Sequence, residues 1–162
     1  MTGEAKQRKL IVAVRVRGIA SAKREARETL QMLRLTRNNY AVLIDDRPSF
    51  LGMLQAAQNY VTWGEISRET LYELLEERGR LSGNKGLNAE YLQKKGHKSL
   101  EELADAVFNS QVEYWKLPNI QPVFKLHPPT KGFKGNIKKS YRAGGELGYR
   151  AEKINELVKR MF

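Results

Sequence analysis

Residues 10–17 read LIVAVRVR, with a valine at every second position from Val12 onward. In an extended chain these valines lie on one face of the backbone, while Arg15 and Arg17 lie on the other face with Ala13. This alternation predicts a half-buried β-strand, and Gly18 marks its end.

The residues that follow predict alternating helices and strands. A helix is expected over residues 21–35, with Ser21 as its N-cap and apolar side chains at helical spacing. A buried strand is expected at residues 40–45, a second helix over residues 48–59, and a short strand at residues 61–63. This β-α-β-α-β order predicts a small α+β domain with two helices on one face of a sheet.

The middle of the chain is helical in character. Ser67 can cap a helix that runs to about residue 78, and residues 88–95 can form a shorter helix. Ser99 and Glu102 have the spacing of a capping box, which opens a helix expected to continue through Trp115. The intervening stretch GRLSGNKG, residues 79–86, is expected to be a loop.

The last section combines few apolar residues with many cations. A strand is expected at residues 123–126 and a short amphipathic helix at residues 151–161. Between Val123 and Arg150 there are seven Lys or Arg residues against one acid, Glu146, and aromatic residues and glycines are interspersed among them. Such a segment is typical of a surface that neutralises phosphates and stacks on bases, although a flexible, solvated basic loop is the alternative.

The chain is therefore expected to have three parts. These are a βαβαβ core over residues 1–66, a helical extension packed on it over residues 67–120, and a final part over residues 121–162. The final part comprises a strand, a basic RNA-binding loop and a short helix.

Charge is distributed unevenly over the 162 residues, whose formal net charge is +11. Residues 1–64 carry 11 basic and 5 acidic side chains, residues 65–120 carry 8 and 10, and residues 121–162 carry 10 and 3. The excess of cations predicts a polyanionic partner, with one face turned toward it and another turned away. No uncharged apolar run approaches the roughly 18 residues needed to span a bilayer, so a membrane is not the expected partner.

The sequence offers little for catalysis or metal binding. There is no cysteine and only two histidines, which excludes disulfides and thiol chemistry and disfavours a zinc site. The glycines and lysine at residues 83–86 lack the spacing of a phosphate-binding loop. Asp45 and Asp46 could hold magnesium, but pairing of a carboxylate with Arg47 is the ordinary explanation. No cofactor and no metal site are expected, and Trp63 and Trp115 are interpreted as core residues.

The candidate functional residues are cations and two rings in the basic parts of the chain. The first set follows the opening strand and its helix: Arg15, Arg17, Lys23, Arg24, Arg27, Arg34 and Arg37. The second set belongs to the last section: Lys125, His127, Lys131, Lys134, Lys138, Lys139, Tyr141, Arg142 and Arg150. Clustered cations of this kind are typical of a phosphate-facing patch.

These residues resemble a known family. The stretches LIVAVRVRG at residues 10–18, TLQMLRL at 29–35 and NYVTWG at 59–64 resemble the L-thirty family of large-subunit ribosomal proteins, called L-seven in eukaryotes. KLHPP at residues 125–129 and GGELG at residues 144–148 are similar to its longer archaeal and eukaryotic form. With only about nine residues before the first strand, the archaeal form is the closer match.

The resemblance implies a ferredoxin-like α+β fold and no enzymatic activity. It implies a cytoplasmic, structural constituent of the large ribosomal subunit that binds ribosomal RNA through the two sets of residues above and contacts neighbouring ribosomal proteins. It leaves open whether 5S rRNA is also contacted. The alternative from another class is a metal-dependent nucleic-acid-processing enzyme that uses Asp45 and Asp46.

Overall fold

The computed structural model describes residues 9–20 and 22–162. The expected N-cap Ser21 lies outside the described residues. The fold is built on a six-stranded sheet with the strand order β6-β2-β1-β3-β8-β7. Its strands in chain order are β1 (Leu10–Arg15), β2 (Tyr40–Asp45), β3 (Val61–Glu65), β6 (Val123–Lys125), β7 (Asn136–Ser140) and β8 (Gly145–Tyr149).

Strand β1 lies in the middle of the sheet and pairs antiparallel with both β2 and β3. The prediction that this strand is half-buried is wrong, because every residue from Leu10 to Arg15 is buried. Val12 and Val14 pack into one apolar cluster and Ala13 packs into a second cluster on the opposite face. Helices cover both faces, so the alternation of residue types does not mark a solvent-exposed side.

Helices α1 (Arg24–Met32) and α2 (Pro48–Ala56) cover one face of the sheet, as predicted, although both are shorter than expected. Leu30 and Leu54 pack there against Trp63 of β3. Pro48 occupies the first turn of α2, where the missing N–H of proline costs no helical hydrogen bond.

The opposite face is covered by α3 (Arg68–Arg78), α5 (Leu100–Phe108) and α6 (Ile154–Arg160), whose apolar side chains share one cluster with Val12 and Val14. The predicted N-caps are confirmed: the hydroxyls of Ser67 and Ser99 accept hydrogen bonds from the first turns of α3 and α5. The prediction that the helix capped by Ser99 continues through Trp115 is wrong, because α5 ends at Phe108. Ser110 adopts a left-handed backbone with φ of 61°, which ends the helical run, and Trp115 falls in the separate turn η1 (Tyr114–Lys116).

The expected loop at residues 79–86 forms a small hairpin instead, made by β4 (Arg80–Leu81) and β5 (Lys85–Gly86). Gly83 and Asn84 both have positive φ, which is the backbone geometry that lets a chain reverse in a tight hairpin. The next helix, α4 (Ala89–Lys94), is present as predicted, with Asn88 as its N-cap.

The basic loop predicted in the last section is present over residues 126–135, whereas the residues that follow it form two strands. Strand β8 adds to the sheet in parallel with β3, and β7 pairs in parallel with β8, with the turn η2 (Tyr141–Ala143) between them. The chain then passes through η3 (Ala151–Lys153) into α6. A Cβ on Gly64 would meet the carbonyl oxygen of Ala151, so only glycine lets η3 approach β3 this closely.

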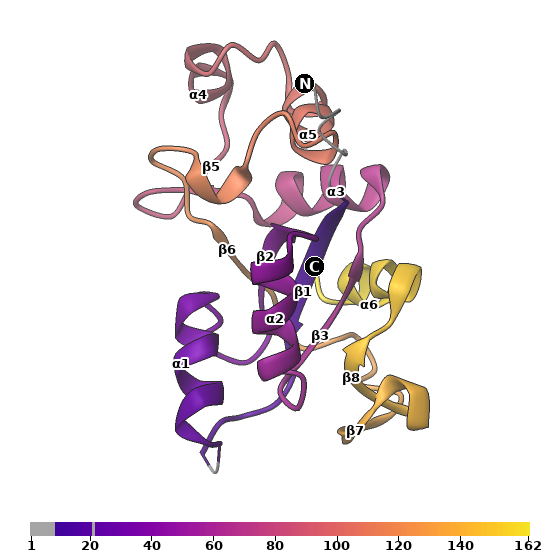
Figure 1. Ribbon diagram of the computed structural model, residues 1–162. Coiled ribbons are helices and arrows are strands. Elements are labelled where there is room, and N and C mark those ends of the chain that lie inside the picture. The colour runs from indigo at the N-terminus through magenta and orange to yellow at the C-terminus, as the bar shows by residue number, and fades with distance from the viewer. Residues whose placement is uncertain (1–8, 21) are drawn as a thin grey trace, which may run out of the picture.

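Figure 1 shows α1 and the β7–β8 region at one end of the molecule, and α4 and α5 at the opposite end. The cation-rich start of α1 and the β7–β8 region therefore lie away from α4 and α5 of the mildly acidic section. None of the helices among residues 9–20 and 22–162 has the length and apolar character required to cross a bilayer.

Candidate nucleic-acid interface

The cations of the first set that follow β1 are mostly exposed. Lys23, Arg24 and Arg27 project from the start of α1, and Arg24 pairs with Glu28 one turn further along at 2.9 Å. The guanidinium of Arg27 donates to the carbonyl oxygen of Ala20 at 2.8 Å, which holds the chain leading into α1. These side chains present positive charge to solvent on a short, fixed helix.

Arg17, Arg34 and Arg37 lie on the connections around α1. The Arg17 guanidinium sits 5.6 Å from the ring centroid of Tyr60, a cation–π contact that orients it while leaving it half-buried. Arg34 has a φ of 63°, which turns the chain away from the end of α1 and leaves its side chain exposed. Arg34 also lines a shallow cavity together with Lys125, so the two predicted sets meet there.

Arg15 is placed differently from its neighbours. Only 5% of its surface is exposed, and its guanidinium donates to the carbonyl oxygens of Leu35 and Arg17, both at 3.2 Å. Burial lowers the pKa of Arg15 from its usual value. The side chain joins the end of β1 to the segment that follows α1, which is a structural contact.

The segment from His127 to Gly132 is folded against the end of α6. The backbone N–H of Thr130 donates to the carbonyl oxygen of Arg160 at 2.9 Å, and the Arg160 guanidinium donates back to the carbonyl oxygens of Thr130 and Gly132. The His127 ring contacts the carbonyl oxygens of Pro128 and Phe162. Lys131, at the tip of this turn, has a φ of 66° and an exposed side chain.

A buried ion pair fixes the β7–β8 region to the sheet. The Arg150 guanidinium donates to Glu146 Oε2 at 2.6 Å, and the two side chains are only 5% and 6% exposed. Arg150 also donates to the Thr62 hydroxyl of β3 at 2.8 Å, and the other Glu146 oxygen accepts from the backbone N–H of Gly135. The Arg150 guanidinium lies 4.9 Å from the ring centroid of Tyr141.

This anchoring leaves the other cations of the segment free to face solvent. Lys134, Lys138, Lys139 and Arg142 are exposed, and Tyr141 is 37% exposed. We use the name basic end for the exposed cations of both sets: Lys23, Arg24, Arg27, Arg34, Arg37, Lys125, Lys131, Lys134, Lys138, Lys139 and Arg142.

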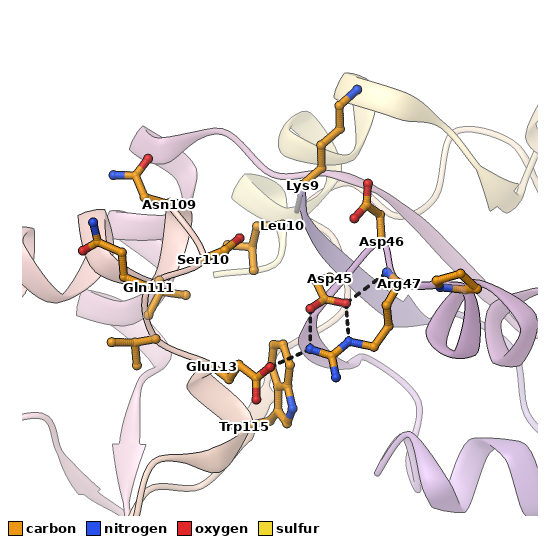
Figure 2. A pocket seen from close by; sticks show the side chains of 13 residues that line it. Lys9, Leu10, Asp45, Asp46, Arg47, Asn109, Ser110, Gln111, Glu113 and Trp115 are labelled. Carbon is orange, nitrogen blue, oxygen red and sulfur yellow. Dashed lines mark hydrogen bonds and ion pairs between the residues drawn. The ribbon is translucent and has the colours of Figure 1, made fainter. Parts of the chain in front are cut away.

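The alternative catalytic site at Asp45 and Asp46 is not supported. Asp45 is buried and accepts hydrogen bonds from the backbone N–H and the guanidinium of Arg47, with the shortest at 2.6 Å. Figure 2 shows Asp46 directed away from Asp45, so the two carboxylates do not converge on one ion. Within the described part of the chain, no group of three His, Cys, Asp or Glu side chains is arranged to hold a metal.

Arg47 instead links the core to the segment after α5. It lies in a cleft of about 1100 Å³, where its guanidinium also donates to Glu113 at 2.6 Å (Figure 2). The rings of Phe50 and Trp115 flank it at 5.0 and 5.6 Å. Trp115 is thus only partly buried, whereas Trp63 is a core residue as predicted. The hydrogen bonds to Asp45 and Glu113 raise the pKa of Arg47. The hydrogen bonds from Lys116 and Arg47, in that order of size, lower the pKa of Glu113.

One candidate residue was missed by the sequence-based selection. Tyr149 is 47% exposed and lies next to Trp63 at a ring-centroid distance of 6.4 Å. Its hydroxyl donates to Glu65, which raises the pKa of Tyr149 to about 12. The signal available in the sequence was its place two residues after Leu147 in a strand-forming stretch, which puts both side chains on one face.

Fold and site together define a class of protein: a small α+β chain with a basic end and, in its described part, no assembled catalytic or metal centre. Comparison with known proteins names the family. The family described as ribosomal protein L30p/L7e matches residues 11–61. The protein named large ribosomal subunit protein uL30 of Thermofilum pendens is 48% identical over 154 residues, which is 94% of this chain and 99% of that protein.

Two further relatives carry the same name. That of Ignicoccus hospitalis is 49% identical over 157 residues, covering 96% of this chain and 99% of the relative. That of Methanopyrus kandleri is 45% identical over 149 residues, covering 91% of this chain and the whole relative. The chain belongs to the uL30 family of large ribosomal subunit proteins, which confirms the resemblance, the α+β fold class and the match to archaeal members.

Proposed function

We propose that this chain is a structural, non-catalytic constituent of the large ribosomal subunit that binds ribosomal RNA through its basic end. Near full-length identity to proteins named for that subunit supports the ribosomal role. Membership of the family places the chain in the ribosome and hence in the cytoplasm. The proposal of an RNA-binding surface rests on one observation: cations from two distant parts of the sequence are exposed at one end of the molecule.

The assignment of individual residues follows from their exposure. The cations of the basic end bind phosphates, because charge-assisted contacts to phosphate supply most of the sequence-independent affinity for RNA. Tyr141, held by Arg150, offers a ring face beside them. Arg17 supports the surface from its contact with Tyr60, and His127 holds the turn that presents Lys131. Arg15 and Arg150 hold the fold.

The opposite end of the molecule is turned away from the RNA. Its surface includes a groove lined by Glu69, Glu73, Glu76 and Glu101, whose charges repel a phosphate backbone. This end suits contacts with neighbouring ribosomal proteins. Direct contact with 5S rRNA is tested by measuring the binding of the purified chain to 5S rRNA alone.

The experiment that tests this function is sedimentation of a lysate from the source organism, followed by mass spectrometry of the fractions before and after a salt wash. We expect stoichiometric comigration with the large subunit. With purified chain and protein-free large-subunit RNA, neutralising about six phosphates should cost roughly a thousandfold in affinity between 50 and 200 mM salt. A chain that stays at the top of the gradient, or a shallow salt dependence, would contradict the proposal.

A further inference from the structure

The sheet is wider than the two helices that cover its first face. Beyond β3 the order continues with β8 and β7, and the side chains of Trp63, Leu147 and Tyr149 lie on the same face of their strands as the cluster under α1 and α2. A cleft of about 580 Å³ opens there between α2 and the turn η2. Its volume lies in the range of small-ligand sites and is large enough for a nucleoside.

We infer that this cleft accepts a single unstacked RNA base on the ring of Tyr149. The inference rests on the proposed function and adds to it a site for a base, distinct from the phosphate contacts of the basic end. Tyr149 is the half-exposed aromatic residue of the cleft, at 47%, whereas Trp63 beside it is only 4% exposed. Exposed aromatic rings are the surfaces on which proteins stack single-stranded bases.

The ring of Tyr149 is held in place before any ligand arrives. Its hydroxyl donates its one proton to the Glu65 carboxylate, whose two oxygens lie 2.6 and 2.8 Å away, and its ring rests against Trp63. The backbone is fixed as well, because the N–H of Arg150 donates to the carbonyl oxygen of Trp63 at 2.9 Å. A side chain that is already ordered loses little conformational entropy on binding.

The lining of the cleft suits a neutral heterocycle. Two cations, Lys9 and Arg142, are balanced by two carboxylates, Asp46 and Glu65, so the cleft lacks the positive excess that a phosphate requires. Gln55 and Gln58 line the α2 side, and each carries an amide that both donates and accepts hydrogen bonds, as base edges do.

The cleft lies beside the basic end, which indicates that the base it accepts belongs to the RNA bound there. Ser140 and Arg142, which line its other side, belong to the same segment as Lys138 and Lys139 of the basic end. An RNA strand whose phosphates lie on that segment can therefore turn one base into the cleft.

The test compares Tyr149→Leu with Tyr149→Phe for binding to protein-free large-subunit RNA across a salt series. Leucine removes the aromatic face, so affinity should fall about fivefold to a hundredfold at every salt concentration, with an unchanged salt slope. Phenylalanine keeps the face and should bind within about twofold of the natural chain. The matched control is Tyr72→Leu, since Tyr72 is partly exposed in the acidic groove at the other end.

Ultraviolet irradiation of intact large subunits gives a second readout. We expect a peptide containing Tyr149 to be crosslinked to one defined nucleotide. If Tyr149→Leu binds as tightly as the natural chain while the steep salt dependence persists, the base site is refuted and the phosphate-binding function stands. If the natural chain lacks a steep salt dependence, the proposed function itself fails.

Discussion

The buried arginines beside the basic end and the exposed ion pair of α3 and α5 show two different uses of the same side chain. Beside the basic end, Arg15 and Arg150 are buried and bonded to protein atoms, while the six lysines and five arginines of the basic end remain exposed. At the opposite end, which we call the helical end because α3, α4 and α5 form it, the pair between Arg68 of α3 and Asp105 of α5 is exposed. The two side chains are 58% and 41% accessible. A count of cations therefore overstates the charge available to a partner, because some of the cations hold the surface that the others occupy.

The largest effect is expected from breaking the buried pair between Arg150 and Glu146, which supports the basic end. Arg150→Ala leaves the Glu146 carboxylate buried without its partner, which should lower the free energy of unfolding by about 3–5 kcal/mol. Urea denaturation measures the change. Arg68→Ala is the matched control and should change stability little, since exposed pairs are screened by water. Equal losses in the two variants would remove the distinction between the ends.

The attachment of the C-terminal segment to the sheet can be broken through Gly64. Gly64→Ala forces a methyl group against the Ala151 carbonyl oxygen and the Ile154 side chain, and should cost about 1–3 kcal/mol or more. Thermal unfolding reports the loss. Gly52→Ala on α2 is the control, because its methyl group would meet nothing within 4 Å and should stabilise the helix by roughly 0.5–1 kcal/mol. A neutral Gly64→Ala would contradict the close packing of η3 on β3.

The functional difference between the ends can be sharpened with two triple variants. Replacing Lys138, Lys139 and Arg142 with alanine should weaken RNA binding roughly tenfold or more, and should reduce the salt slope by about 0.7–0.9 for each phosphate that is no longer neutralised. The melting temperature should stay nearly unchanged, because all three side chains are exposed. Replacing Lys94, Lys95 and Lys98 at the helical end removes the same charge and should leave the salt slope unaltered.

The smallest effect is expected at the ion pair between Arg47 and Glu113, which links the start of α2 to the segment after α5. The folded-state pKa of Glu113 is lowered, so its contribution to stability is present above the unfolded pKa of about 4.3 and is lost as pH falls through the folded pKa. Glu113→Gln should therefore flatten the decline of stability below about pH 4, measured by urea denaturation from pH 3 to 7. An acid limb as steep as that of the natural chain would show that this carboxylate contributes nothing.

Local patterns in the sequence were sufficient to predict the elements that depend on contacts between residues close together in the chain. Strand β2, the caps Ser67 and Ser99, and the short helix predicted over residues 88–95 are found where propensity and capping place them. The pairing of a carboxylate with Arg47 is confirmed for the same reason, since the partners are two residues apart.

Long-range pairing was beyond sequence reasoning. The basic segment has weak strand propensity of its own, and it becomes β7 and β8 because β3 offers an open edge and Arg150 reaches Thr62 across 88 positions. The burial of Arg15 depends on a carbonyl oxygen 20 positions away. The division of the chain into three parts stays a prediction, because residues of the outer two parts and of the helical section share one apolar cluster.

The most direct test of the two-ended arrangement is lysine acetylation of the free chain and of intact large subunits, quantified by mass spectrometry. The account predicts that Lys131, Lys134, Lys138 and Lys139 react in the free chain, where they are exposed, and are protected in the subunit. Lys94, Lys95 and Lys98 serve as the comparison and should be protected less than these four lysines, because their end of the molecule does not face the RNA. If the lysines of the basic end react equally in the subunit and in the free chain, that end does not face the RNA, and the account is contradicted.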